Sequence, residues 1–243
     1  YRNLYLQLSV PYSQSKVSQV LLQHASITHQ LFRYFETKFS TSSAFGTKEY
    51  RLKESLPGLE KDFIESLQKV EEVSDDIILR QLFRMIQETL RTNYYIPKPP
   101  TDTFISIKIN SQKIKFMPLP MPFKEIYVHD VNLEGTHLRF GPISRGGLRW
   151  SDRPDDFRKE ILGLVKTQQV KNVVIVPEGS KGGFVIKKLP TDKQEALQEG
   201  ERQYQRFISA LLDMTDTFDD QGQVIVPHGV IAYDEQDPYL VVA

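Results

Sequence analysis

Residues 96–109 read IPKPPTDTFISIKI, and the character of the sequence changes within them. The prolines in residues 97–100 cannot continue a helix. After them, residues 103–109 alternate with period two and are rich in isoleucine, which is typical of a β-strand. We therefore place a domain boundary here, with a helical region at residues 1–100 and a sheet-containing domain at residues 101–243, and we expect strands only after residue 101.

The sequence before the prolines has the spacing of amphipathic helices. Apolar residues recur at three- and four-residue steps over residues 15–39, and a second helical stretch spans about residues 59–70. A third helix is predicted to open at Ser74, a residue type that is common at N-caps, with Asp75 and Asp76 in its first turn. The N-terminal region is therefore predicted to be helical.

Strands and helices alternate after the prolines. Further strands are predicted at residues 125–129, 137–140, 173–176, 224–226 and 239–242, and helices from Ser151 or Asp152 to about Lys171 and over about residues 192–214. The run VVIV at residues 173–176 is typical of a strand that is buried on both faces, and a glycine loop is predicted to follow it at residues 179–183. This alternation predicts an α/β domain with a mixed sheet.

The composition excludes several classes of function. Among the 243 residues, 31 are basic and 31 acidic, so the zero net charge gives no electrostatic argument for nucleic acid or an anionic membrane as a partner. The absence of cysteine excludes disulfides, thiol nucleophiles and cysteine–metal sites. No apolar run reaches the roughly 20 residues that a membrane span needs, and the five histidines have no metal-ligand spacing, so we expect no metal site.

The densest cluster of candidate site residues lies between Arg145 and Gly183. Arg145 precedes the pair Gly146-Gly147, and Lys181 precedes Gly182-Gly183. Glycines let a backbone approach a ligand closely, and a cation beside such a turn suits a carboxylate or phosphate. The alternative is that both are surface turns with solvated charges. A loop that follows the carboxyl end of a buried strand is where α/β sheets place ligands, which favours Lys181 as a catalytic residue.

A lysine also ends the apolar stripe of the helix between the two glycine pairs. At roughly 100° per residue, Phe157, Ile161, Leu164 and Gln168 share one face of the helix, and Lys171 falls on the same face. Lys166 falls on the opposite, solvated side. Lys171 is therefore a candidate for the same pocket, although a lysine at a helix C-terminus can also extend along the apolar surface toward water. Cations that converge on one pocket would bind a dicarboxylate, and their repulsion would turn one amine into an acid–base catalyst.

Other catalytic motifs are missing from the sequence. It contains no P-loop spacing, no Gly-x-Gly-x-x-Gly dinucleotide fingerprint and no Gly-x-Ser-x-Gly elbow. The residues alone therefore favour an anion-binding or acid–base site over nucleotide binding or hydrolysis.

Four segments closely resemble the large NAD-dependent glutamate dehydrogenases. They are RGGLRWSDR at residues 145–153, LGLVKTQQVKNVVIVP at 162–177, GSKGGF at 179–184 and DPYLVVA at 237–243. The match is specific from about residue 103 to the end and weaker in the helical region. The resemblance implies a glutamate-dehydrogenase-like substrate domain in an enzyme that converts L-glutamate to 2-oxoglutarate and ammonia with NAD.

The resemblance also implies roles for individual residues. Arg145, Gly146, Gly147 and Lys171 would bind the substrate carboxylates, and Lys181 would be the acid–base catalyst. The wider family has lysine where this sequence has Arg145, so the carboxylate would be held with a different geometry. The segment from Lys171 to Lys181 is shorter than in small family members, which leaves Lys166 as the alternative substrate lysine.

Both ends of the sequence are typical of an internal piece. The first residue is not methionine, and the last residues are predicted to be a strand with no tail after it. We therefore expect that the family's catalytic aspartate and its nucleotide-binding domain follow the last residue, and that this piece alone is inactive. The full protein is expected to be a cytoplasmic homo-oligomer. The alternative is a non-enzymatic interaction or oligomerisation segment of a large multidomain protein.

Overall fold

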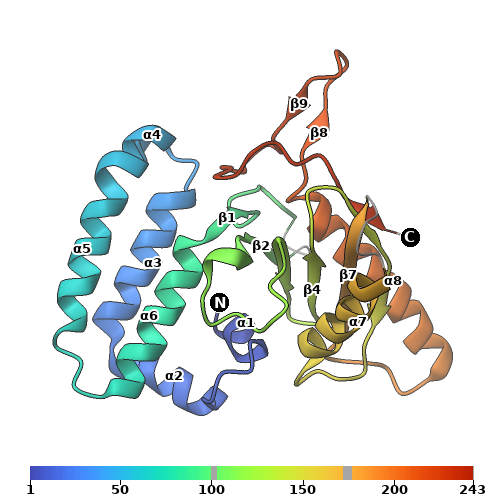
Figure 1. Ribbon diagram of the computed structural model, residues 1–243, viewed down its shortest axis with the longest axis horizontal. Helices are drawn as coiled ribbons and strands as arrows, with labels where there is room; N and C mark the ends of the chain where they lie inside the picture. Colours follow the sequence, from blue (N-terminus) through green and yellow to red (C-terminus); the bar gives the residue numbers. More distant parts are fainter. Residues whose placement is uncertain (100–102, 172–176, 243) are drawn as a thin grey trace. The chain divides into compact units, whose positions relative to one another are not determined.

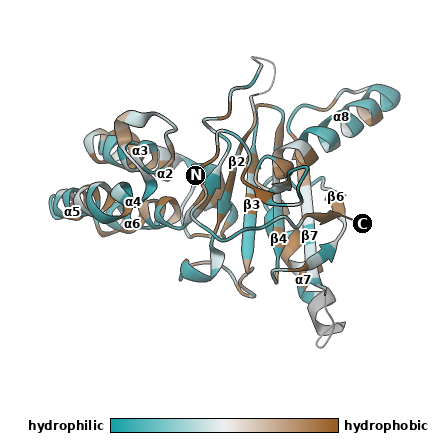
Figure 2. Cartoon of the chain, turned by 90° about the horizontal axis from the view of Figure 1, so that it is seen from above, coloured by the Kyte–Doolittle hydropathy of each residue, from teal (hydrophilic) through white to brown (hydrophobic). Residues whose placement is uncertain are grey.

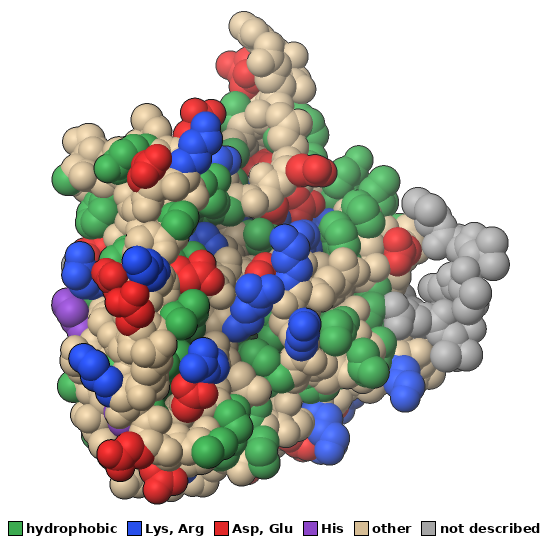
Figure 3. Space-filling model, turned by 60° about the vertical axis from the view of Figure 1, so that its left-hand side comes forward, with side chains coloured by type: hydrophobic (Ala, Val, Ile, Leu, Met, Phe, Trp, Pro, Cys, Tyr) green, Lys and Arg blue, Asp and Glu red, His purple; other side chains and the backbone are tan. Residues whose placement is uncertain are grey.

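The computed structural model describes residues 1–99, 103–171 and 177–242. The chain divides into two compact units, Tyr1–Glu88 and Thr89–Ala243, so the boundary expected at residue 100 lies inside the second unit. None of the helices in the described residues is long and apolar enough to span a bilayer. On the face shown in Figure 3, basic and acidic side chains are interspersed, in keeping with the zero net charge.

The first unit is built of helices. They are α1 (Arg2–Gln7), α2 (Gln14–Gln23), α3 (Ala25–Phe39), α4 (Lys48–Tyr50), α5 (Leu56–Leu67) and α6 (Val73–Gln87), with a 3-10 turn at Ser43–Phe45 and a π-turn at Arg51–Ser55. Helices α3, α5 and α6 lie side by side (Figure 1). Their core is aromatic, since the rings of Tyr34 and Phe63 both pack on Phe83, at centroid distances of 4.9 and 4.1 Å.

Two predictions for the helices of this unit differ in detail from the structure. The helical stretch at residues 15–39 is two helices, because the backbone leaves the helical region at His24 (φ −102°, ψ 49°). Helix α6 begins at Val73, and its N-cap is Glu72, whose backbone is extended, rather than Ser74. The apolar spacing predicted the helices correctly, but it did not predict the backbone geometry at their ends.

The second unit is a mixed sheet with one long helix on each face. Its strands are β1 (Thr89–Thr92), β2 (Ile105–Ile109), β3 (Lys124–His129), β4 (Leu133–Arg139), β5 (Ser144–Gly146), β6 (Leu148–Trp150), β7 (Glu178–Ile186) and β10 (Val241–Val242). The strand order is β1-β2-β3-β4-β7-β5-β10, and β6 also pairs with β7. Neighbouring strands in the order β1-β2-β3-β4-β7 are antiparallel. Strand β7 pairs in parallel with β5 and with β6, and β5 pairs in parallel with β10. The predicted α/β class with a mixed sheet is confirmed.

Helices α7 (Phe157–Lys171) and α8 (Lys193–Leu212) cover opposite faces of this sheet (Figure 2). Leu133 of β4 packs in the cluster that α8 contributes to, and Leu138 packs with residues of α7. The two leucines are five positions apart on one strand, so they point to opposite faces. A two-stranded hairpin, β8 (Thr217–Phe218) and β9 (Val224–Ile225), follows α8 and projects from the sheet (Figure 1).

The expectation that strands begin only after residue 101 is wrong. Strand β1 forms the edge of the main sheet, where Thr89 pairs with Ile109 and Thr92 with Ile107. The prolines thus belong to the connection between β1 and β2. The error has a physical cause: four residues that directly follow a helix show no period of their own, and their extended conformation is stabilised by pairing with β2.

Candidate functional site

The glycine-rich segment at residues 179–183 is a strand and not the predicted loop. It lies within β7, which pairs with β4 on one side and with β5 and β6 on the other. Glycine predicts turns from local sequence, but here the missing side chains let neighbours pack closely. A Cβ on Gly183 would lie 2.3 Å from Ile161 Cδ1, and one on Gly182 would lie 2.3 Å from Leu148 Cδ2. Lys181 therefore lies in the first half of a central strand. The strand predicted at residues 173–176 lies outside the described residues.

The first glycine pair lies at the end of β5, where Gly146 is the last residue of the strand and Gly147 separates it from β6. Strands β5 and β6 run along the same side of β7, and Gly147, which lies between them, accepts a hydrogen bond from the Gly182 amide (3.1 Å). A Cβ on Gly146 would lie 1.6 Å from the carbonyl oxygen of Ser180. Only glycine permits this approach, so the residue type at position 146 sets the distance between β5 and β7.

The strand pairing brings two predicted site segments together. Arg145 is level with Gly179 in the parallel pair of β5 and β7, so Lys181 is two residues further along the neighbouring strand. Arg145 is exposed, and Lys181 is partly exposed. Leu138, the partner of Lys181 in β4, packs on Ile161 and Leu162 of α7. Lys181 therefore shares the face of the sheet that α7 covers.

The third predicted element is the helix that ends at Lys171. Helix α7 begins at Phe157, several residues later than the predicted cap at Ser151 or Asp152, because residues 154–156 form a turn. The side chain of Lys171 lies outside the described residues, so its place in the site stays a prediction.

The buried face of α7 differs from the predicted stripe. Phe157, Ile161 and Val165 are each fully buried, whereas Leu164 is 38% exposed. Lys166 is exposed. The stripe that pointed Lys171 inward is thus partly wrong, since the packing of α7 on the sheet selects a face one residue away from Leu164.

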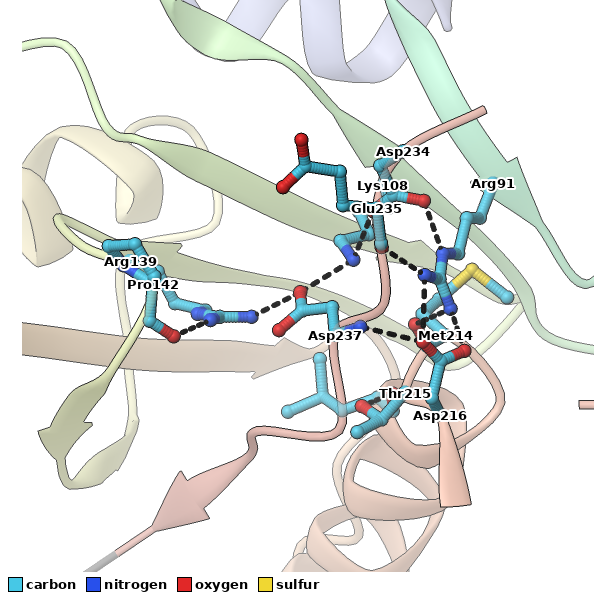
Figure 4. Close-up of polar contacts among 11 residues, drawn as sticks. Arg91, Lys108, Arg139, Pro142, Met214, Thr215, Asp216, Asp234, Glu235 and Asp237 are labelled. Atoms are coloured by element: carbon cyan, nitrogen blue, oxygen red, sulfur yellow. Dashed lines mark hydrogen bonds and ion pairs between the residues drawn. The ribbon is translucent and has the colours of Figure 1, made fainter. Parts of the chain in front are cut away.

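A buried cluster of charges was missed in the sequence. Three cations come from the strands, and three carboxylates come from the segment that follows α8: Arg91, Lys108, Arg139, Asp216, Asp234 and Asp237 (Figure 4). In the alternating pattern of β2, Lys108 would face solvent. Its partner Asp237 is 129 residues away in the sequence, so only the tertiary structure reveals that this face is covered.

The contacts of this cluster are short and pair each cation with at least one carboxylate. Arg91 binds both oxygens of Asp216 and donates to Asp234 Oδ1 at 2.6 Å. Asp237 Oδ2 accepts from Lys108 Nζ and Arg139 Nη1, each at 2.6 Å. Burial alone would raise the pKa of Asp237, but the hydrogen bond from Arg139 and the charge of Lys108 outweigh it and hold the pKa below its ordinary value.

His137 is a second buried group that the sequence did not single out. It is 1% exposed, and within the described part of the chain neither ring nitrogen has a hydrogen-bond partner. Burial first, and then the nearby charge of Arg139, lower the pKa of His137 to about 3. The ring is therefore neutral in the folded protein at all physiological pH values.

The titration of His137 should make stability depend on pH. Because the folded pKa is below the unfolded one, the unfolded chain binds a proton first as the pH falls through about 6.5. The stabilisation is complete above that pH and is lost progressively toward pH 3. We expect His137→Gln to remove about 1.4 kcal/mol per pH unit from the slope of unfolding free energy across this window. Urea unfolding at pH 7 and pH 4.5 measures it, with the exposed His29→Gln as the control. Equal slopes for the wild type and His137→Gln would contradict the prediction.

Comparison with known proteins places this geometry in a family. The family model described as "Bacterial NAD-glutamate dehydrogenase, catalytic domain" matches residues 62–243. The chain belongs to the bacterial NAD-glutamate dehydrogenase family. A second model, "Glutamate dehydrogenase, helical motif 3", matches residues 1–41.

Individual members of the NAD-glutamate dehydrogenase family agree with this assignment. The chain is 42% identical over 241 residues to the NAD-specific glutamate dehydrogenase of Pseudomonas aeruginosa and 44% identical over 250 residues to that of Mycobacterium tuberculosis. Each alignment covers 98% of this chain but only 15% of the relative. The 243 residues therefore correspond to a small part of the enzymes that they resemble, and the resemblance inferred from the four motif segments is confirmed.

Proposed function

We propose that this chain forms the substrate side of the active site of an NAD-dependent glutamate dehydrogenase. The observation that carries the proposal is the pairing of β5 with β7, which puts the Arg145-Gly146-Gly147 segment beside Lys181. Cations on adjacent strands suit a ligand with two carboxylates, which is the chemistry of glutamate and 2-oxoglutarate. The names of the relatives point to the same substrate.

The residues divide the work as follows. Arg145 and Lys171 hold the two carboxylates of the substrate and orient its α-carbon. If the face of α7 that carries Lys166 points toward the substrate, Lys166 takes this role in place of Lys171. Oxidation of the amino acid leaves an imine at that carbon. Lys181 takes a proton from the water that adds to the imine carbon and returns one to the nitrogen, so that ammonia leaves and the 2-oxo acid forms.

The hydride acceptor, NAD, is not expected to bind at these glycines. Within the described residues, Ser180 fills the space above Gly146, and Ile161 fills the space above Gly183, so neither glycine can cradle a pyrophosphate. The sequence also has no dinucleotide fingerprint. We therefore assign NAD binding to a part of the protein outside this chain. When bound, NAD accepts the hydride from the substrate α-carbon.

The direct test uses the full-length protein. We expect glutamate-dependent reduction of NAD, with 2-oxoglutarate and ammonia formed in equal amounts, and no turnover by the 243-residue chain alone. If this chain is instead a non-enzymatic interaction segment, the full-length protein should form the same oligomer. Substitutions at Arg145, Lys171 and Lys181 should then leave its turnover unchanged. Absence of amino-acid-dependent NAD reduction in the full-length protein would overturn the proposal. We also propose a cytoplasmic homo-oligomer, which fractionation and light scattering test.

A further inference from the structure

Arg139 contacts the segments that lead into β5 and β10, two paired strands at the candidate site. Its Nη1 donates to Asp237 Oδ2 at 2.6 Å, and its Nη2 donates to the carbonyl oxygen of Pro142 (Figure 4). Pro142 is two residues before β5, and Asp237 is four residues before β10. Arg139 is itself the residue of β4 that pairs with Ser180, the neighbour of Lys181. The buried guanidinium of Arg139 thus contacts the segment before β5 and the segment before β10.

Strands β5 and β10 pair with each other at residues proposed to bind the substrate. In the parallel pair of β5 and β10, Val241 is level with Arg145 and Val242 with Gly146. Strand β10 has only two residues, and its valines are at most partly buried. So short an edge pairing is weak by itself, and contacts elsewhere must hold the segment in register.

Asp237 supplies that anchor. Its backbone N–H donates to Asp216 Oδ2 at 2.6 Å, and its carboxylate also accepts from Lys108 Nζ at 2.6 Å. Arg139 and Lys108 are 4% and 1% exposed in their side chains, so the pairs are shielded from water and from salt. Loss of the Asp237 carboxylate would leave the buried charge of Arg139 without the acidic partner it has in the described residues, which costs more than loss of a surface pair.

We propose that Arg139 and Asp237 are positioning residues for the candidate active site. They hold β5 between β7 and β10 and thereby set where Arg145 stands relative to Lys181. Neither touches the reacting atoms. The inference rests on the proposed function for its kinetic consequence, but its structural consequence can be measured without turnover.

The test compares Arg139→Met, Arg139→Lys and Asp237→Asn in the full-length protein. The matched control is Arg206→Met, which removes an arginine paired at 2.9 Å with the buried Asp130, in the turn between β3 and β4. We expect amide hydrogen exchange at residues 143–147 and 239–242 to become at least tenfold faster in the Arg139 and Asp237 variants and to stay unchanged in the control. KM for glutamate should rise about tenfold in Arg139→Met, with a smaller change in kcat, and Arg139→Lys should recover part of it.

The double variant Arg139→Met/Asp237→Asn separates positioning from general destabilisation. If the two residues act through one contact, its KM should match that of the worse single variant rather than the product of both. Exchange rates and KM values equal to those of Arg206→Met would overturn the inference. If Arg139→Met does not fold, Arg139→Lys and Asp237→Asn decide by the same comparison. If the wild type lacks glutamate turnover, the proposed function fails, and the exchange data still decide the positioning role.

Discussion

Lys181→Ala in the full-length protein should lower kcat for glutamate oxidation by about 10²-fold or more, with a much smaller change in KM. A positioned acid–base group contributes about 10²- to 10⁴-fold to a rate. Lys181 is partly exposed in a strand beside the Arg145 segment, so it can reach a bound substrate and exchange protons with water. Steady-state kinetics with saturating NAD measures both constants.

Two further lysines give the matched comparison for this result. Lys188 is exposed just beyond the end of the same strand, and Lys188→Ala should leave both constants unchanged. Lys181→Arg keeps the charge but places it differently, and a guanidinium does not give up its proton, so it should remain impaired. A normal kcat for Lys181→Ala would mean that the segment at residues 179–183 has only a structural role.

The residues proposed to bind the substrate carboxylates should show the opposite kinetic pattern. Arg145→Ala and Lys171→Ala are expected to act mainly on KM, because they remove binding that substrate and transition state share. Comparing Lys171→Ala with Lys166→Ala identifies which lysine of α7 faces the substrate.

Gly146→Ala should both destabilise the second unit and abolish most activity. The added Cβ would lie 1.6 Å from a backbone oxygen of β7, so β5 must move away from its neighbour. Overpacking of this kind costs about 1–3 kcal/mol or more. A shift of about 1 Å in a substrate-binding group can reduce a rate about 10²-fold. Urea unfolding and the glutamate assay measure the two effects.

Gly163→Ala is the matched control for the glycine substitution. Gly163 lies in α7, and a Cβ there would meet nothing within 4 Å. Alanine favours a helix over glycine by about 1 kcal/mol, so this variant should unfold at a higher urea concentration. If Gly146→Ala unfolded at the wild-type urea concentration with normal KM and kcat, the close approach of β5 to β7 would be irrelevant to the site.

The sequence by itself determined the elements whose pattern is local and long. Apolar spacing predicted α3 and α6, and strict alternation at residues 103–109 predicted β2 to within two residues. The helix predicted over about residues 192–214 is α8, which Asp192 caps through the amides of Gln194 and Glu195. The motif segments were enough to identify the family, because they depend on residue identity rather than on conformation.

The tertiary structure decided whatever depends on pairing between distant segments. Thr89–Thr92 became a strand because β2 offers it an edge, and Gly179–Gly183 became a strand because neighbours on both sides fill the space that its glycines leave. Lys108 and Arg139 look solvated in a strand pattern but are buried by carboxylates roughly 100 or more residues later. Local propensity amounts to fractions of a kcal/mol per residue, whereas removing one partner of a buried ion pair costs about 3–5 kcal/mol. The pairing of β5 with β7 sets Arg145 level with Gly179 and so places it near Lys181, and no pattern within either segment encodes that pairing.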